Sequence, residues 1–156
     1  MRLDGRSGMA PAVLPVAGYS TRPLPDKLGL KPGMVVAFVA LPGELDSLAS
    51  STAFAQVERL ARWSDDLGPA CRFDAIHAFA SRRAEVEGGL LRLQSAIRRD
   101  GMIWVSWPKK AAKVATDIGE DVVRAAALRL DLVDIKVAAV DATWSALKLV
   151  IRKDRR

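Results

Sequence analysis

Residues 100–110 have the sequence Asp-Gly-Met-Ile-Trp-Val-Ser-Trp-Pro-Lys-Lys, and this stretch decides the fold of the chain. It is a short apolar run that begins after a glycine turn and ends at a proline and two lysines. Runs of this length with β-branched and aromatic residues are typical of strands buried on both faces of a parallel sheet. Residues 34–40 and 75–80 are similarly apolar. The sequence therefore predicts three strands inside one sheet.

A helix is predicted between the last two of these strands. Apolar residues recur at helical spacing over residues 86–97, and Ser81 precedes them in the position of an N-cap. The helix contains Gly88 and Gly89, each of which costs about 1 kcal/mol relative to alanine in a helix interior. We expect these glycines to let the helix approach the sheet closely.

The other helices and an outer strand follow from shorter patterns. They are a helical turn at residues 26–30, a helix at residues 44–53, a weak edge strand at residues 56–63 and a helix at residues 117–130. Asp117 and Glu120 have the spacing of a capping box at the start of the last helix.

Residues 133–140 and 144–152 are predicted to form the last two strands. Only three residues connect them, which requires an antiparallel hairpin. The apolar residues of the first arm are expected on one face, and Asp134 and Lys136 on the other. The order of elements predicts a three-layer α/β domain of Rossmann-like type, with helices on both faces of a mostly parallel sheet.

Length and composition fit one globular domain. The chain has 156 residues, of which 50% are hydrophobic. We expect residues 1–17 to be a flexible N-terminal extension and residues 18–156 to be a single α/β domain. The lone Cys71 excludes an internal disulfide framework and suits a reducing cytoplasm. Because the longest apolar stretch, residues 34–41, is too short to span a bilayer, we predict a cytoplasmic protein without a membrane partner.

The charge balance is basic. Lys and Arg outnumber Asp and Glu by 24 to 18, which gives a formal net charge of +6. This excess favours weak attraction to polyanions, so a nucleic-acid partner stays open. The basic residues are scattered, however, and no stripe interleaved with aromatic residues is present for binding a single strand. A solvated basic surface is the main interpretation.

Several segments resemble the class I methyltransferase-type Rossmann domain. Residues 27–33, Lys-Leu-Gly-Leu-Lys-Pro-Gly, precede an apolar strand as they do at the opening of that domain. Residues 73–76 and 100–103, with a helix between them, and the terminal hairpin continue the resemblance. The segment between the first and third strands is too short for the family's usual count, so the resemblance implies that one strand–helix unit is deleted.

A narrower resemblance covers nearly all of the chain from Gly18. The matching segments are Gly18-Tyr19-Ser20, Pro23-Leu24, Lys27-Leu28-Gly29, residues 104–110, Thr116-Asp117 and residues 140–145. They resemble the bacterial family called domain of unknown function 3052. That resemblance implies a fold and no activity.

The carboxyl ends of the predicted strands form the candidate binding site, because ligands of doubly wound sheets bind there, at the switch point. Its residues are Leu41, Gly43, Ser81, Arg82, Trp107, Lys109 and Lys110. The two lysines, with the helix start at Asp117 nearby, suit an anionic group; a solvated basic loop is the alternative. Ser81 and Arg82 leave a similar choice between a ligand site and a helix cap with a surface charge.

The methyltransferase resemblance implies S-adenosylmethionine as cofactor and a glycine-rich loop after the first strand to hold it. Residues 40–46, Ala-Leu-Pro-Gly-Glu-Leu-Asp, carry one glycine at that place. Side chains in such a loop collide with the ligand. The resemblance also implies an acidic residue after the second strand for the ribose hydroxyls, and Asp65 or Asp66 is available. The main interpretation therefore has no cofactor.

No catalytic or metal-binding constellation is predicted. His77, the only histidine, lies within a strand, so a buried or edge imidazole is expected rather than a general base. No second His or Cys lies at metal-ligand spacing. Cys71 is expected to be an ordinary small residue, and Glu85 and Glu87 cannot face one another on a helix.

The main functional interpretation is a non-catalytic Rossmann-like domain that binds an unknown protein or a small anionic ligand at the candidate site. Two alternatives stay open: a divergent S-adenosylmethionine-dependent methyltransferase, and a nucleic-acid-associated accessory protein. Self-association through the terminal hairpin is a further expectation, because sheet edges pair readily.

Overall fold

The computed structural model describes residues 22–156. The expected N-terminal extension at residues 1–17, and the start of the predicted domain up to residue 21, lie outside the described residues.

The described chain alternates strands with short helices before it ends in a hairpin. The elements are α1 (Leu24–Lys27), β1 (Val35–Val39), the 3-10 helix η1 (Gly43–Ser50), β2 (Gln56–Leu60), β3 (Phe73–Phe79), α2 (Arg83–Ala96), β4 (Ile97–Pro108), the 3-10 turn η2 (Lys110–Ala112), α3 (Glu120–Leu128), β5 (Leu132–Ala139), β6 (Trp144–Ile151) and the 3-10 turn η3 (Lys153–Arg155).

The strands form one sheet in the order β2-β1-β3-β4-β6-β5. The first four in this order run parallel, and β6 runs antiparallel to both of its neighbours. The predicted mostly parallel sheet with a C-terminal antiparallel hairpin is therefore confirmed. The weak edge strand predicted at residues 56–63 is β2, which lies at the edge of the sheet and ends at Leu60.

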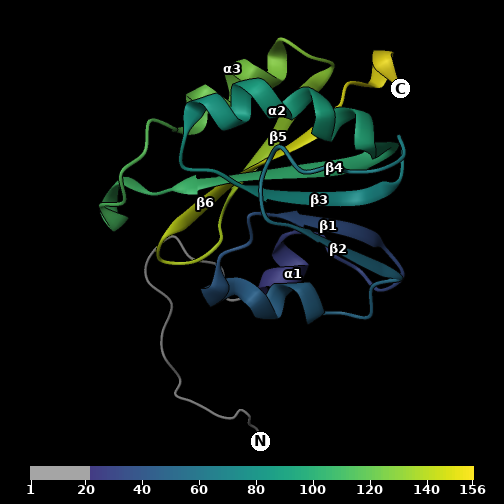
Figure 1. Ribbon diagram of the computed structural model, residues 1–156, viewed down its shortest axis with the longest axis horizontal. Helices are drawn as coiled ribbons and strands as arrows, with labels where there is room; N and C mark the ends of the chain where they lie inside the picture. The colour runs from purple at the N-terminus through teal and green to yellow at the C-terminus, as the bar shows by residue number, and fades with distance from the viewer. Residues whose placement is uncertain (1–21) are drawn as a thin grey trace, which may run out of the picture.

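Helices cover both faces of the sheet (Figure 1). α2 and α3 pack on one face, which we call the α2 face, over a core that contains Ile103 and Trp107. α1 and η1 lie against the other, the α1 face, over Phe38 and Trp104. The two tryptophans of β4 thus point to opposite faces, because side chains alternate along a strand. The indole N–H of Trp104, completely buried, donates to the carbonyl of Leu28 at 2.9 Å.

The connection from β2 to β3 contains no strand or α-helix. Residues 61–72 cross the α2 face as turns and bends, and Trp63 and Leu67 from this segment are buried in the core on that face. The indole N–H of Trp63 donates to the carbonyl of Phe79 at 2.9 Å. The resemblance to methyltransferase-type domains implied that one strand–helix unit is deleted before the third strand. This short connection, between β2 and β3, has no such unit.

Gly89 makes the close approach that the sequence predicted, but to a different partner. A Cβ placed at Gly89 would lie 2.8 Å from Cε3 of Trp63, whereas a Cβ at Gly88 would meet nothing within 4 Å. At Gly89, α2 therefore approaches the tryptophan of the β2–β3 connection rather than the sheet. Length and apolar spacing gave no information about this contact, because the connection carries no periodic pattern.

Two predicted helix starts are wrong. α2 begins at Arg83 with Arg82 as N-cap, since the carboxylate of Glu85 reaches back to the amides of Ser81 and Arg82. α3 begins at Glu120 with Gly119 as N-cap, so the capping box that starts at Asp117 does not form.

Asp117 instead accepts a hydrogen bond from the backbone amide of Arg83 at 2.6 Å. That amide is one of the first in α2 and has no partner within the helix. The carboxylate predicted to cap α3 therefore caps α2. The predicted helix at 44–53 is also corrected: it is the 3-10 helix η1, which is kinked at Leu45.

The predicted face assignment in β5 is wrong because of a bulge. The pairing with β6 shifts between Asp134 and Lys136, and Asp134 receives a hydrogen bond from Arg124 of α3. Lys136 lies opposite Lys148, on the α1 face. The extra residue, Ile135, changes the alternation, so the two charged residues point to opposite faces.

Candidate functional site

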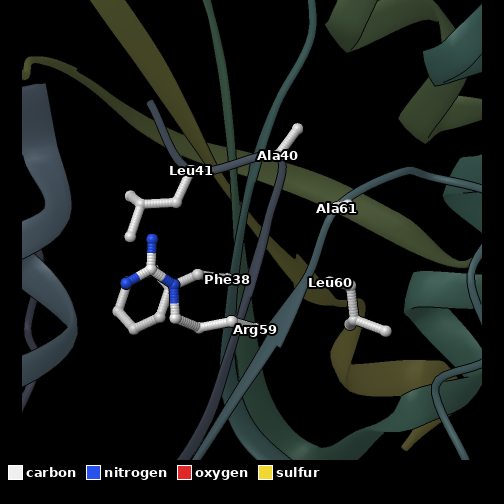
Figure 2. Close-up of a pocket in the computed structure, with 6 residues that line it drawn as sticks. All are labelled: Phe38, Ala40, Leu41, Arg59, Leu60 and Ala61. Carbon is white, nitrogen blue, oxygen red and sulfur yellow. The ribbon is translucent and has the colours of Figure 1, made fainter. Parts of the chain in front are cut away.

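A cavity of about 490 Å³ lies where β1 and β2 end. Because β2, β1, β3 and β4 are parallel, their carboxyl ends share one edge of the sheet. The order of the strands reverses direction between β1 and β3, and this is the place where sheets of this type bind ligands. The residues that line the cavity are Phe38, Ala40, Leu41, Arg59, Leu60 and Ala61. We call it the β1–β2 cavity (Figure 2).

The chain leaves β1 in a tight left-handed turn at Ala40, with φ of 56°. The amide of Ala40 still donates to the carbonyl of Leu60 at 2.8 Å, so the turn begins directly at the end of the β1–β2 ladder. Positive φ is the conformation that glycine adopts most easily. The backbone of this loop thus has a turn suited to close approach of a ligand, although an alanine stands where glycine is favoured.

Side chains from both strands project over one side of the cavity. Figure 2 shows Phe38, Leu41 and Arg59 on the same side of the strand ends, and Leu60 on the other. Phe38 is buried in the core of the α1 face. The cavity therefore has an apolar wall and one cationic group.

Arg59 forms an ion pair with Asp46 of η1, with Nη2 and Oδ1 2.6 Å apart. About half of each side chain is exposed, 49% for Arg59 and 60% for Asp46. Exposed ion pairs of this kind contribute about 0–1 kcal/mol. A ligand that offers a carboxylate to Arg59 or hydroxyls to Asp46 can therefore replace the pair at little cost.

Of the residues predicted from the sequence, Leu41 lines the β1–β2 cavity. Gly43 lies two residues further on, exposed at the start of η1. Ser81 is half-buried at the end of β3, where its carbonyl accepts a hydrogen bond from the hydroxyl of Thr116. Arg82 lines a second cavity of about 440 Å³ beside Trp63 and the first turns of α2.

The remaining predicted residues lie at the end of β4 and directly after it. Trp107 is buried in the core of the α2 face. The ammonium group of Lys109 donates to the carbonyl of Asp141 at 2.6 Å and so joins the end of β4 to the β5–β6 turn. Lys110 is exposed at the start of η2. None of these three residues lines the β1–β2 cavity.

The sequence did not single out Arg59 and Asp46. The weak edge strand predicted at residues 56–63 contains Arg59, but the partner of Arg59 is 13 positions away, in η1. Asp65 and Asp66, the acidic candidates for ribose hydroxyls, are engaged in local turns. Asp65 accepts from the amide of Arg62 at 3.0 Å, and Asp66 accepts from the amide of Gly68 at 2.9 Å.

His77 is buried, as the sequence predicted. Its Nε2 lies 2.6 Å from the hydroxyl oxygen of Ser106, its ring stacks on Phe79 at 4.3 Å, and its Nδ1 has no partner among the described residues. Desolvation by burial lowers the pKa of His77 to about 3. The imidazole is therefore neutral at ordinary pH, and it does not line the β1–β2 cavity.

The described part of the chain has neither a candidate metal site nor a candidate membrane-spanning helix. Residues 22–156 contain no cluster of three or more His, Cys, Asp or Glu side chains that could hold a metal ion. No helix in the same range is long and apolar enough to cross a membrane.

Several solved structures with a similar fold are described as methyltransferases. A putative type 11 methyltransferase from Sulfolobus solfataricus aligns with a TM-score of 0.62 and 13% identity, over 83% of this chain and 90% of its own. An S-adenosylmethionine-dependent methyltransferase from Aquifex aeolicus aligns with a TM-score of 0.60 and 15% identity, over 81% and 87%. Magnesium protoporphyrin IX methyltransferase from Synechocystis PCC 6803, solved with bound S-adenosylmethionine, aligns with a TM-score of 0.56 and 15% identity, over 81% and 74%.

The fold is methyltransferase-like. No family model and no curated protein matches the sequence, so the narrower resemblance to domain of unknown function 3052 stays an interpretation. The leading functional expectation from the sequence, a non-catalytic binding domain, is wrong on this comparison. The neighbours in fold include methyltransferases, one of them solved with bound S-adenosylmethionine and another described as dependent on it, and they favour the methyltransferase alternative.

Proposed function

We propose that this chain is an S-adenosylmethionine-dependent methyltransferase that binds its cofactor in the β1–β2 cavity. The observation that carries the proposal is the position of that cavity, at the switch point of a methyltransferase-like sheet. Its volume of about 490 Å³ lies within the range of small-molecule sites.

The residues present suit the parts of this cofactor. Leu41, half-buried beside the buried ring of Phe38, supplies an apolar surface for the adenine ring. The guanidinium of Arg59 suits the carboxylate of the methionine portion, because arginine recognises carboxylates with two parallel donors. Asp46 is paired with Arg59, which lines the cavity, and its carboxylate supplies an acceptor for the ribose hydroxyls. The cofactor would contribute a methyl group on a sulfonium, which is already activated for transfer.

Two features indicate modest affinity. The Cβ of Ala40 occupies the turn at which glycine would allow the closest approach. Ala61, directly after β2, offers no carboxylate for the ribose. The acceptor therefore comes from η1, on a side chain that is largely exposed. We expect a dissociation constant of about 10–100 μM, in the middle of the range of about 1 μM to 1 mM that is usual for the KM values of enzymes.

Calorimetric titration with S-adenosylmethionine and S-adenosylhomocysteine tests the proposal. Leu41→Trp fills the cavity and is expected to weaken binding at least tenfold. Leu128→Trp is the matched control, because Leu128 is an exposed leucine of α3 outside the cavity. No heat and no thermal shift with millimolar ligand, or equal binding by the two variants, contradicts the proposal.

A second experiment tests methyl transfer. The protein is incubated with methyl-labelled S-adenosylmethionine and fractions of a bacterial extract, and the label in protein, nucleic acid and small molecules is counted. We expect incorporation with the wild type and the Leu128→Trp variant that falls at least tenfold with Leu41→Trp. Equal incorporation by all three proteins would assign the label to other enzymes.

A further inference from the structure

Three lysines converge on the α1 face near the amino ends of the parallel strands, opposite to the β1–β2 cavity. Lys136 and Lys148 are direct partners across β5 and β6, and Lys31 lies in the turn before β1. Lys148 points away from the α2-face core, which holds its neighbours Leu147 and Leu149. We call these residues the lysine cluster.

The lysine cluster has no carboxylate partner. Within residues 22–156, no ion pair involves Lys31, Lys136 or Lys148. Several arginines of the same molecule are paired; Arg124, for example, contacts both Glu120 and Asp134. The three ammonium groups therefore have no ion-pair partner within residues 22–156.

This arrangement is unfavourable when nothing else is bound. Like charges directly opposite each other on neighbouring strands destabilise a sheet. Burial, and then the charges of Lys136 and Lys31, lower the pKa of the half-buried Lys148. The bulge at Ile135 turns Lys136 to this face, so the pairing of the two lysines depends on a specific irregularity of β5.

Lys31 and Lys148 line a cavity of about 330 Å³. Met102 and Val150 form apolar parts of its wall. Gly29, with φ of 70°, turns the backbone beside Met102. The cavity therefore combines cationic groups with an apolar surface and is large enough for a small organic ligand.

Two carboxylates also line this cavity, and neither neutralises the lysines. Asp74 accepts a hydrogen bond from the amide of Val35 at 2.8 Å, and its other oxygen lies 3.7 Å from the guanidinium of Arg98. Asp100 is exposed and forms no ion pair within the described chain. The ammonium groups are thus not paired with these carboxylates, and Lys136 adds a third positive charge beside the two lysines and two aspartates that line the cavity.

We propose that the lysine cluster binds the phosphate group of a small phosphorylated molecule whose organic part rests against Met102 and Val150. A phosphate monoester carries up to two negative charges and three terminal oxygens, which matches three ammonium donors better than a single carboxylate does. Lysine commonly binds phosphate as a point charge. This site lies at the opposite end of the strands from the β1–β2 cavity and does not depend on the proposed methyl transfer.

Thermal unfolding with inorganic phosphate, glycerol 3-phosphate and chloride at equal ionic strength tests the inference. Lys148→Met keeps an unbranched side chain, one atom shorter, and removes its charge. Lys153→Met, at an exposed position in η3 that does not line the cavity, is the control. We expect both phosphates to stabilise the wild type and the control, with an apparent affinity at least tenfold lower for Lys148→Met.

Three outcomes overturn the inference. They are equal stabilisation of both variants, equal stabilisation by chloride, and binding only to a short single-stranded DNA added in a parallel titration. Without phosphate, Lys148→Met is expected to unfold at a temperature equal to or higher than the wild type, because a repulsive contact is removed. A lower temperature would mean that the lysines do not repel each other.

Discussion

Alanine substitutions at the two adjacent glycines of α2 should have opposite effects. Gly88→Ala adds a methyl group into open space, so it gains helix propensity and should stabilise the protein by about 0.5–1 kcal/mol. Gly89→Ala gains the same propensity, but its Cβ would lie 2.8 Å from Cε3 of Trp63. Carbon atoms prefer a separation of about 3.5–4.0 Å, so the ring must move by nearly 1 Å.

Trp63 is held too firmly to move freely. Only 6% of Trp63 is exposed, and its indole N–H donates to the carbonyl of Phe79. The guanidinium of Arg92 donates to the backbone carbonyl of Trp63. Overpacking such a site costs about 1–3 kcal/mol. After the gain in propensity, Gly89→Ala should destabilise the protein by about 0–2 kcal/mol, which places it about 1–3 kcal/mol below Gly88→Ala.

Urea unfolding and thermal unfolding, both followed by circular dichroism, measure this difference. In a protein of this size, each kcal/mol corresponds to about 2–4 °C in the unfolding temperature. Replacing Trp63 by Leu should then make Gly89→Ala neutral or stabilising, because the clash is gone. Equal unfolding midpoints for the two alanine variants, or the same effect of Gly89→Ala with and without Trp63, would refute the reasoning.

Three further predictions concern single side chains. His77 has a pKa of about 3 in the folded state and 6.5 in the unfolded state, so the unfolded state binds the proton first as the pH falls. The stability that depends on a neutral imidazole is therefore complete above pH 6.5 and is lost as the pH falls toward 3. The loss should reach about 3 kcal/mol at pH 4 and be absent from His77→Gln, as measured by urea unfolding of both proteins from pH 7 to pH 4. Trp104→Phe removes the donor to the buried carbonyl of Leu28 and should cost about 1–3 kcal/mol in the same assay at pH 7; a smaller loss would mean that water replaces the donor. Asp117→Ala removes the carboxylate that accepts from the amide of Arg83 and should cost about 0.5–2 kcal/mol, with faster hydrogen exchange in the first turn of α2; unchanged exchange there would contradict its role as a cap.

Short sequence patterns were sufficient to predict most of the strands of the sheet. The apolar run of β4 and the three-residue link before Trp144 gave a buried strand and an antiparallel hairpin, because each is a property of a short segment. The caps of α2 and α3 were mispredicted, since Asp117 caps a helix that begins 34 residues before it. The faces of β5 were mispredicted because nothing in its alternation marks the bulge at Ile135.

The candidate site was predicted only in part, for a similar reason. The rule that ligands bind at the carboxyl ends of strands led to Leu41, which lines the β1–β2 cavity. The rule did not lead to Arg59, because a charged residue on an edge strand has the same pattern whether it faces solvent or a cavity. Its pairing with Asp46 depends on the path of η1, which no local signal reports.

The shortened β2–β3 connection links these observations. Because no strand follows on its outer side, β2 is the edge of the sheet, and the cavity that we assign to the cofactor has an edge strand as one wall. Val57 is 41% exposed, and Glu58 and Arg59 carry charges that discourage pairing with another chain. A cofactor against such a strand is covered on fewer sides than one held between two inner strands. Its affinity should therefore be limited by rapid release, and a substitution that closes the open side, such as Val57→Trp, should slow dissociation more than it changes association.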